Sequence, residues 1–417
     1  MITTITIKTK QISSEQIFMF TMFLVNAGNY LYNLLLGRFL GPKAFADAAI
    51  LITFLLVLSF VGMTFQIVTT KYSVLLEEPI KNKFIQLMTK VSILAGIGIG
   101  SFFMFFSKDL QNVLHTETQT MFQLFGIGIP FYFLMSVNRG IYQGAQNLKQ
   151  LSVTYITEMV ARLFLTVVLL YFTLQLPNTV LVAFGIVVSF IFGLFPLQKR
   201  VFQKKEAKRA VLEMKPILTF FVLTAFYELT QIIINNSDVI LVKHFFNNTE
   251  AGYYASLALI GRVVYFVTWI FVMLLLPKVI QLQKEGKQTE PMLMKYVLFI
   301  SFFSSSIVLV TFIMPELIVK IMFGNAYLAI APLLWKYALA TAVFAVANVF
   351  AYYFLSIGNY VPVIVSAFLG IVQVGLLLFF HNSLHQVVYM QIIAMIFLLA
   401  LQIIYFIYQQ KKRIRLQ

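Results

Sequence analysis

The sequence predicts an all-α polytopic membrane protein. Of its 417 residues, 60% are hydrophobic and only 11% are charged, and the mean hydropathy is +0.88, whereas soluble globular chains carry about 25% charged residues. The apolar residues gather in runs of about 20, the length that lets a helix cross a hydrocarbon core of about 30 Å. Runs such as residues 91–106 are apolar on nearly every face, unlike the alternating strands of a membrane β-barrel.

Polar and turn-forming residues divide the apolar runs into twelve predicted membrane spans. The main breaks are Gly41-Pro42, the charged stretch 77–83, Pro177-Asn178 and Gly358-Asn359, residue types that end helices or form turns. The predicted spans are residues 16–37, 45–70, 88–107, 121–142, 150–173, 178–197, 216–237, 251–277, 295–315, 331–356, 361–380 and 387–409.

The basic residues predict the orientation of these spans. With twelve spans, 23 of the 31 Lys and Arg residues fall on one side, five fall on the other, and three (Arg162, Arg262 and Lys336) fall within spans. Cytoplasmic loops of membrane proteins are enriched in Lys and Arg. Both termini are therefore predicted to be cytoplasmic.

A basic stretch at residues 199–215 divides the chain into two halves of six spans each, 1–205 and 206–417. A shift of 206 positions without gaps lays residues 34–49 over residues 240–255 and matches Asn29 with Asn235 and Phe39 with Phe245. Because each half has an even number of spans, the halves keep the same orientation and form parallel repeats. This arrangement predicts two six-helix lobes with a central cavity.

Two hairpins carry a resemblance to a known family. Residues 34–49 read LLLGRFLGPKAFADAA, which resembles the turn LxRxLGPxxYGxxA, and residues 236–255 contain a counterpart that ends in Ala251-Gly-Tyr-Tyr-Ala255. Both resemble the Wzx-type polysaccharide flippases of the multidrug/oligosaccharidyl-lipid/polysaccharide exporter superfamily, which also holds the MATE drug antiporters and the lipid II flippase. Phe45-Ala46 departs from the Tyr-Gly pair of that turn.

The resemblance implies a MATE-like fold in the plasma (inner) membrane of a bacterium. It implies translocation of undecaprenyl-diphosphate-linked oligosaccharide repeat units by alternating access, for cell-surface polysaccharide, lipopolysaccharide or O-antigen biosynthesis. The implied partners are the lipid-linked substrate, membrane lipids and the polysaccharide polymerase machinery. A MATE-type cation-coupled drug antiporter is the alternative, since it has the same plan.

Ionisable residues at membrane depth are the candidate site residues, because each costs about 2.5–3.5 kcal/mol on insertion scales unless it is paired or hydrated. Glu158 and Arg162 are four residues apart, so they share a helix face and either neutralise each other or line the cavity. Arg262 has no acid within one turn. Glu228 of the preceding span is its nearest candidate partner; otherwise Arg262 faces the cavity and holds a diphosphate.

Further candidates lie near the span ends. Arg139 stands at the predicted cytoplasmic end of the fourth span, where it serves topology or meets substrate phosphate. Asn29 and Asn235 occupy matched positions in the first span of each half, where amides either meet sugar hydroxyls or join helices. Asp238 is a candidate ligand for a coupling cation, H⁺ or Na⁺.

Several functional classes are excluded or disfavoured. The sequence has no P-loop motif and no cysteine, which excludes ATP binding by a P-loop and thiolate metal sites. The run Gly96, Gly98 and Gly100 lies inside a span, so it indicates close helix packing and not a dinucleotide site. The net charge is +16, but most of the basic residues lie beside the predicted spans, where they set the topology. The charge therefore does not indicate a nucleic-acid-binding protein. A lipid-linked-sugar polymerase needs a large outward loop, but the longest predicted outward segments, residues 109–120 and 316–330, are short. No enzyme is therefore predicted, and no metal site or organic cofactor is expected.

Overall fold

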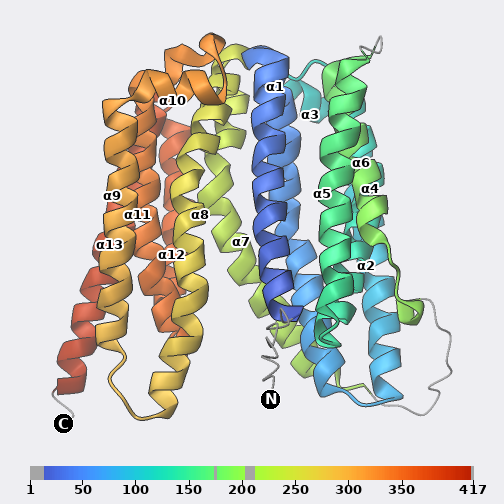
Figure 1. Ribbon diagram of the computed structural model, residues 1–417, viewed down its shortest axis with the longest axis vertical. Helices are drawn as coiled ribbons and strands as arrows, with labels where there is room; N and C mark the ends of the chain where they lie inside the picture. Colours follow the sequence, from blue (N-terminus) through green and yellow to red (C-terminus); the bar gives the residue numbers. More distant parts are fainter. Residues whose placement is uncertain (1–13, 173–175, 202–211, 415–417) are drawn as a thin grey trace, which may run out of the picture. The chain divides into compact units, whose positions relative to one another are not determined.

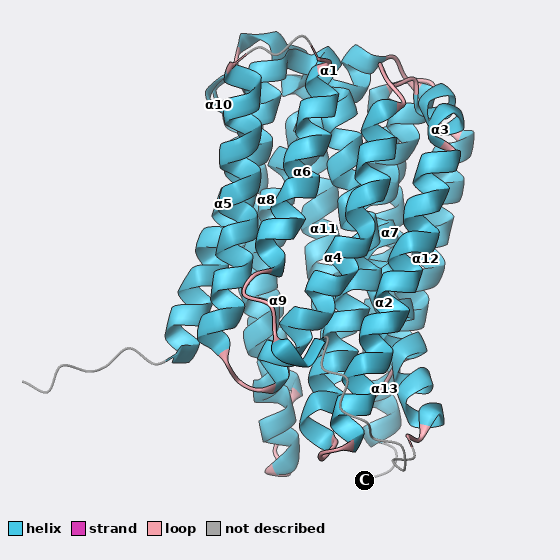
Figure 2. Cartoon of the chain, turned by 90° about the vertical axis from the view of Figure 1, so that its right-hand side faces the viewer, coloured by secondary structure: helices cyan, strands magenta, loops and turns pink. Residues whose placement is uncertain are grey.

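The computed structural model describes residues 14–172, 176–201 and 212–414, and every regular element in these ranges is helical (Figures 1 and 2). Helices satisfy their own backbone hydrogen bonds, which a bilayer interior requires. The elements are α1 (Ser14–Leu75), α2 (Ile80–Phe105), α3 (Ser107–Leu114), α4 (Thr120–Gly144), α5 (Leu148–Tyr171), α6 (Asn178–Leu194), η1 (Lys199–Val201), α7 (Met214–Phe245), α8 (Asn248–Lys284), α9 (Glu290–Ile313), α10 (Pro315–Met322), η2 (Asn325–Ile330), α11 (Ala331–Ser356), α12 (Val361–Phe379) and α13 (Leu384–Ile414).

Helix α1 contains two helices joined at Gly41. This glycine has φ 72° and ψ 172°, a conformation that residues with a Cβ rarely adopt. Pro42 follows it, and proline fits the first turn of a helix because that position needs no amide donor. The break predicted between the first two spans is confirmed.

The prediction of a helical, multi-pass membrane protein is also confirmed. Within the described residues, nine helices are long and apolar enough to cross a membrane, and α1 counts once among them. Each predicted span overlaps one of the helices, with residues 16–37 and 45–70 both in α1.

The chain forms two compact units. Among the described residues, those of unit 1 fall within 1–32, 61–107 and 120–224, and those of unit 2 fall within 33–60, 108–119 and 225–417. Residues 33–60, which we call the first hairpin, thus group with unit 2, although the rest of α1 belongs to unit 1. The boundary predicted between residues 205 and 206 lies outside the described residues.

In unit 1, glycines allow α2 and α4 to pack with their backbones in contact. A Cβ placed on Gly100 would lie 2.4 Å from the carbonyl oxygen of Gly126, and one on Gly96 would lie 2.5 Å from Cα of Pro130. Gly98 has nothing within 4 Å of such a Cβ. Close packing therefore explains Gly96 and Gly100, as predicted, but not Gly98.

In unit 2, α11 packs against α8, α9, α12 and α13. Buried side chains from these helices form the core, among them Ile300, Val349, Phe350 and Phe354, and Leu398 of α13 packs with Phe344 in a neighbouring cluster. This packing fixes the helices that carry the second group of candidate residues.

Candidate functional site

Unit 1 contains a cluster of two arginines and one glutamate, which we call the guanidinium cluster (Arg139, Glu158 and Arg162). Nη2 of Arg139 on α4 lies 2.7 Å from Oε2 of Glu158 on α5, and Arg162 binds the other carboxylate oxygen. The three side chains are 6%, 11% and 11% exposed, respectively. Two buried guanidinium groups therefore share one carboxylate, and the cluster keeps an excess of one positive charge.

Polar groups fix the orientation of both arginines. Arg139 donates from Nε to Oγ1 of Thr154 (3.1 Å) and from Nη2 to the carbonyl oxygen of Thr154 (2.9 Å). Its guanidinium carbon lies 3.8 Å from the ring centroid of Tyr155, a cation–π contact. Arg162 donates to Oγ of Ser189 (3.4 Å) and approaches Oδ1 of Asn29 at 3.5 Å.

This geometry partly answers the sequence expectations for unit 1. The pair of Glu158 with Arg162 is present, and Asn29 joins it. The sequence predicts that Arg139 lies at the end of the fourth span, where it serves topology or substrate entry. The structure instead buries Arg139 against Glu158. Its position on α4 gave no signal of this partner, because pairing between helices follows no sequence spacing.

Unit 2 contains a buried carboxylate, Asp238 of α7, held by three side chains. Its Oδ2 accepts hydrogen bonds from the hydroxyls of Tyr254 (3.0 Å) and Tyr337 (2.9 Å) and from the amide of Gln391 (2.7 Å). Its Oδ1 is buried and has no hydrogen-bond donor among the described residues. Sequence reasoning identified Asp238 but not its partners.

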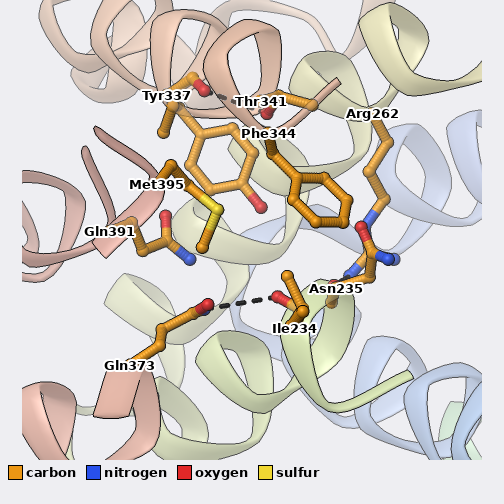
Figure 3. Close-up of a pocket in the computed structure, with 10 residues that line it drawn as sticks. Ile234, Asn235, Arg262, Tyr337, Thr341, Phe344, Gln373, Gln391 and Met395 are labelled. Atoms are coloured by element: carbon orange, nitrogen blue, oxygen red, sulfur yellow. Dashed lines mark hydrogen bonds between the residues drawn. The ribbon is translucent and has the colours of Figure 1, made fainter. Parts of the chain in front are cut away.

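A pocket adjoins this carboxylate and contains Arg262 (Figure 3). Tyr337 and Gln391 contribute to both the pocket and the contacts of Asp238. The free volume of the pocket is about 30 Å³, which suits a small ion or a few waters. The lining residues are Ile234, Asn235, Arg262, Tyr337, Ala340, Thr341, Phe344, Gln373, Gln391 and Met395.

Arg262 reaches the pocket without an acidic partner in the described part of the chain. Its Nη2 donates to the backbone carbonyl of Asn235 at 2.7 Å, and its Nε is buried without an acceptor among the described residues. Asn235 thus contributes its backbone, while its side-chain amide donates to the carbonyl of Gln231 at 2.7 Å.

The pairing considered for Arg262 and Glu228 is wrong. Glu228 lies seven residues before Asn235 on α7, about 10 Å along the helix axis. Arg262 instead contacts α7 at the backbone carbonyl of Asn235. Among the described residues, Glu228 forms no ion pair. The guanidinium charge of Arg262 is therefore not neutralised by this acid.

Other buried polar residues of unit 2 also have oxygens without a donor among the described residues. Gln373 donates from its amide to the carbonyl of Ile234 (3.3 Å). Its Oε1, Oε1 of Gln391 and Oδ1 of Asn236 are buried, and no described residue donates to them. Gln373 and Gln391 are each the single strongly polar residue of an apolar run, residues 370–378 and 387–397. An isolated polar residue inside a predicted span is the sequence signal that identifies such a candidate.

Metal sites need several ligands close together. In the described ranges, no group of three or more His, Cys, Asp and Glu side chains is placed to hold a metal ion. The oxygens around Asp238 belong instead to one carboxylate, amides and hydroxyls, which are ligands for hard cations.

Membrane-length helices with buried guanidinium groups characterise this chain as a helical membrane protein, and solved structures share its fold. An inward-facing multidrug resistance MATE family transporter of the MOP superfamily aligns with a TM-score of 0.74 and 14% identity over 91% of this chain and 95% of that one. The lipid II flippase MurJ, in an inward closed conformation, aligns with a TM-score of 0.74 and 16% identity over 93% of this chain and 87% of that one. An outward-facing multidrug resistance MATE family transporter aligns with a TM-score of 0.57 and 13% identity over 96% of each chain.

At these identities the likeness establishes the fold, which this chain shares with MOP-superfamily structures. A family model described as polysaccharide biosynthesis protein matches residues 35–332, well over half of the chain. The chain belongs to this polysaccharide biosynthesis protein family. No individual curated protein matches it.

Proposed function

We propose that this protein translocates undecaprenyl-diphosphate-linked oligosaccharide repeat units across a bacterial plasma (inner) membrane. The units would supply a cell-surface polysaccharide such as O-antigen or lipopolysaccharide and pass to the polymerase machinery. Membership of the polysaccharide biosynthesis family and the flippase-like fold support this proposal.

The observation that carries the proposal is the excess of buried positive charge. Arg139 and Arg162 share one carboxylate, and among the described residues the guanidinium of Arg262 donates to a backbone carbonyl and forms no ion pair. A planar guanidinium binds phosphate oxygens with two parallel hydrogen bonds, so these groups would bind a diphosphate when the cavity opens during transport. A drug antiporter of cations would favour acidic cavity residues instead.

The proposed architecture has twelve membrane crossings in two six-helix lobes, residues 1–205 and 206–417, with both termini in the cytoplasm. The overlap of each predicted span with a helix and the bias of Lys and Arg support it. Alternating access of a central cavity would then carry the headgroup across the bilayer.

A monovalent cation, Na⁺ or H⁺, would couple to transport at Asp238. The buried Oδ1 of Asp238 and the amide oxygens of Gln373 and Gln391, to which no described residue donates, support this role. Either cation would neutralise a carboxylate that lacks a basic partner among the described residues.

The test is deletion of the gene followed by analysis of lipid-linked intermediates. Repeat units should accumulate on the cytoplasmic leaflet, and wild type should relieve the accumulation whereas Arg262→Ala should not. Arg262→Lys keeps the charge but loses the planar fork, so its activity should be intermediate. Lys287→Ala, at an exposed side chain, is the matched control and should behave as wild type.

The contrary outcome is equally specific. Efflux of cationic drugs that is lost on deletion, with normal surface glycan and no stalled lipid-linked units, would replace this proposal with the MATE-type antiporter.

A further inference from the structure

The first hairpin packs against residues of the second half of the chain. We call this contact surface the socket, and it contains Lys243, Gly252, Phe323 and Tyr327. The Tyr327 hydroxyl donates to the carbonyl of Gly37 at 2.7 Å, and the Phe45 ring lies 5.9 Å, centroid to centroid, from the Phe323 ring. A Cβ on Gly252 of α8 would lie 1.8 Å from the carbonyl oxygen of Pro42, so the two backbones are in contact. All of these residues belong to unit 2.

A fully buried ion pair lies in this socket. Nζ of Lys243 on α7 is 2.6 Å from Oδ1 of Asp47 in the first hairpin, and each side chain is 2% exposed. Oδ2 of Asp47 accepts the backbone N–H of Glu117 at 2.8 Å, and Lys243 also donates to Oδ1 of Asn248. Both partners are thus held by further hydrogen bonds.

Such a pair is a poor device for stability alone. Removing two charges from water costs as much free energy as their attraction returns, so apolar residues would hold the hairpin at least as well. Buried ion pairs are better suited to fixing one of two arrangements. The contact therefore points to a function in which it both forms and breaks.

The course of α1 indicates what would break it. Residues 14–32 and 61–75 of this helix belong to unit 1, whereas the first hairpin between them belongs to unit 2. Inside α1, Gly41 at the hairpin tip is the residue with non-helical dihedral angles, so no break is present near residues 32 or 60. Continuous helices on both sides would transmit a movement of unit 1 directly to the socket.

We propose that Asp47 and Lys243 form the latch of the outward-facing gate, and that this ion pair is formed in the structure. In the closed state the ion pair holds the first hairpin in its socket. During the transport cycle the pair separates, the hairpin leaves unit 2 together with the rest of α1, and each charge becomes hydrated. This inference rests on the alternating access of the proposed function, but the residues that form the latch do not depend on the substrate.

Thiol accessibility tests the latch without any substrate. The chain contains no cysteine, so Phe45→Cys introduces a single thiol in the socket. A membrane-impermeant maleimide should label it slowly from the outer side, and the neutral double variant Asp47→Asn/Lys243→Gln should raise the labelling rate about tenfold or more, because a minor open state of 0.1–10% becomes prominent. Glu285→Gln/Lys287→Gln, which removes an exposed ion pair, is the matched control and should leave the rate unchanged.

Two labelling results would overturn the proposal. An unchanged rate in the neutral double variant would show that the pair does not hold the hairpin. Faster labelling from the side that holds the C-terminus would show that the gate faces the cytoplasm.

Cross-linking tests whether release is required for transport. Gly37→Cys/Phe323→Cys would tie the hairpin to its socket, since a Cβ on Gly37 lies 2.3 Å from the Phe323 ring. Gly28→Cys/Met159→Cys is the matched control inside unit 1, where a Cβ on Gly28 lies 2.4 Å from Sδ of Met159. The probe is a fluorescent polyprenyl-diphosphate N-acetylglucosamine in phosphatidylethanolamine–phosphatidylglycerol vesicles.

Oxidation of the socket pair should abolish translocation of the probe, and a reductant should restore it, while the control pair keeps its activity in both states. Translocation at the full rate by the oxidised socket pair would overturn the latch. If even the reduced proteins fail to move the probe, the proposed function fails, and the labelling experiment alone then decides whether the latch exists.

Discussion

Arg139 and Glu158 form a buried ion pair of 2.7 Å between α4 and α5, and the same carboxylate binds Arg162. Glu158 is therefore the group that makes two buried guanidinium groups tolerable. Gly193 of α6 packs directly on it, since a Cβ at that position would lie 2.8 Å from Cβ of Glu158.

Glu158→Gln should destabilise the protein strongly. The substitution keeps the shape but leaves two guanidinium groups without a carboxylate, and breaking a buried pair costs about 3–5 kcal/mol. Thermal unfolding in detergent should show a lower Tm, and the double variant Glu158→Gln/Arg162→Gln should recover part of the loss because one charge is removed. Equal Tm values for Glu158→Gln and wild type would contradict the charge count of this cluster.

Gly100→Ala should destabilise the contact of α2 with α4. The added methyl group would lie 2.4 Å from the Gly126 carbonyl oxygen, and overpacking typically costs about 1–3 kcal/mol. Gly98→Ala is the matched control on the same helix, because nothing lies within 4 Å of its Cβ position. We expect Tm to fall only for Gly100→Ala; a similar fall for both would indicate a backbone effect and not packing.

Asp238→Asn should abolish the effect of the coupling cation on stability. A ligand at 100 times its Kd stabilises a protein by about 2.7 kcal/mol, so the wild-type Tm should rise when choline chloride is replaced with NaCl. The variant should show no rise, whereas Asp109→Asn, at an exposed acid, should respond as wild type. No response to Na⁺ in the wild type, together with a pH-dependent Tm that Asp238→Asn removes, would assign the site to H⁺.

Asn138→Asp should destabilise unit 1 more than Asn138→Ala. The buried Asn138 amide donates to the carbonyls of Leu194 and Pro196, both at 3.0 Å, and its oxygen accepts from the N–H of Gln198 at 3.0 Å. Alanine leaves these groups unpaired, at about 1–3 kcal/mol, while a carboxylate would in addition face two carbonyl oxygens. The Tm order wild type, Ala, Asp checks this; a more stable Asp variant would mean that the carboxyl is protonated there.

The amino-acid sequence by itself determined the features that local rules govern. Runs of apolar residues required helices, because only internally bonded backbone is stable in a bilayer, and Gly41-Pro42 marked the break inside α1. The helical repeat alone placed Glu158 and Arg162 on one helix face, and the structure shows that they pair there.

Only the tertiary structure decided which residues meet between helices. It gave Glu158 its second arginine, directed Arg262 to the carbonyl of Asn235 and not to Glu228, and buried Lys243 against Asp47. The predicted spans 216–237 and 251–277 place Lys243 in the loop between them. The physical reason is that a polar group inside a membrane needs a partner but accepts many kinds, so packing geometry and not residue spacing selects the one it receives.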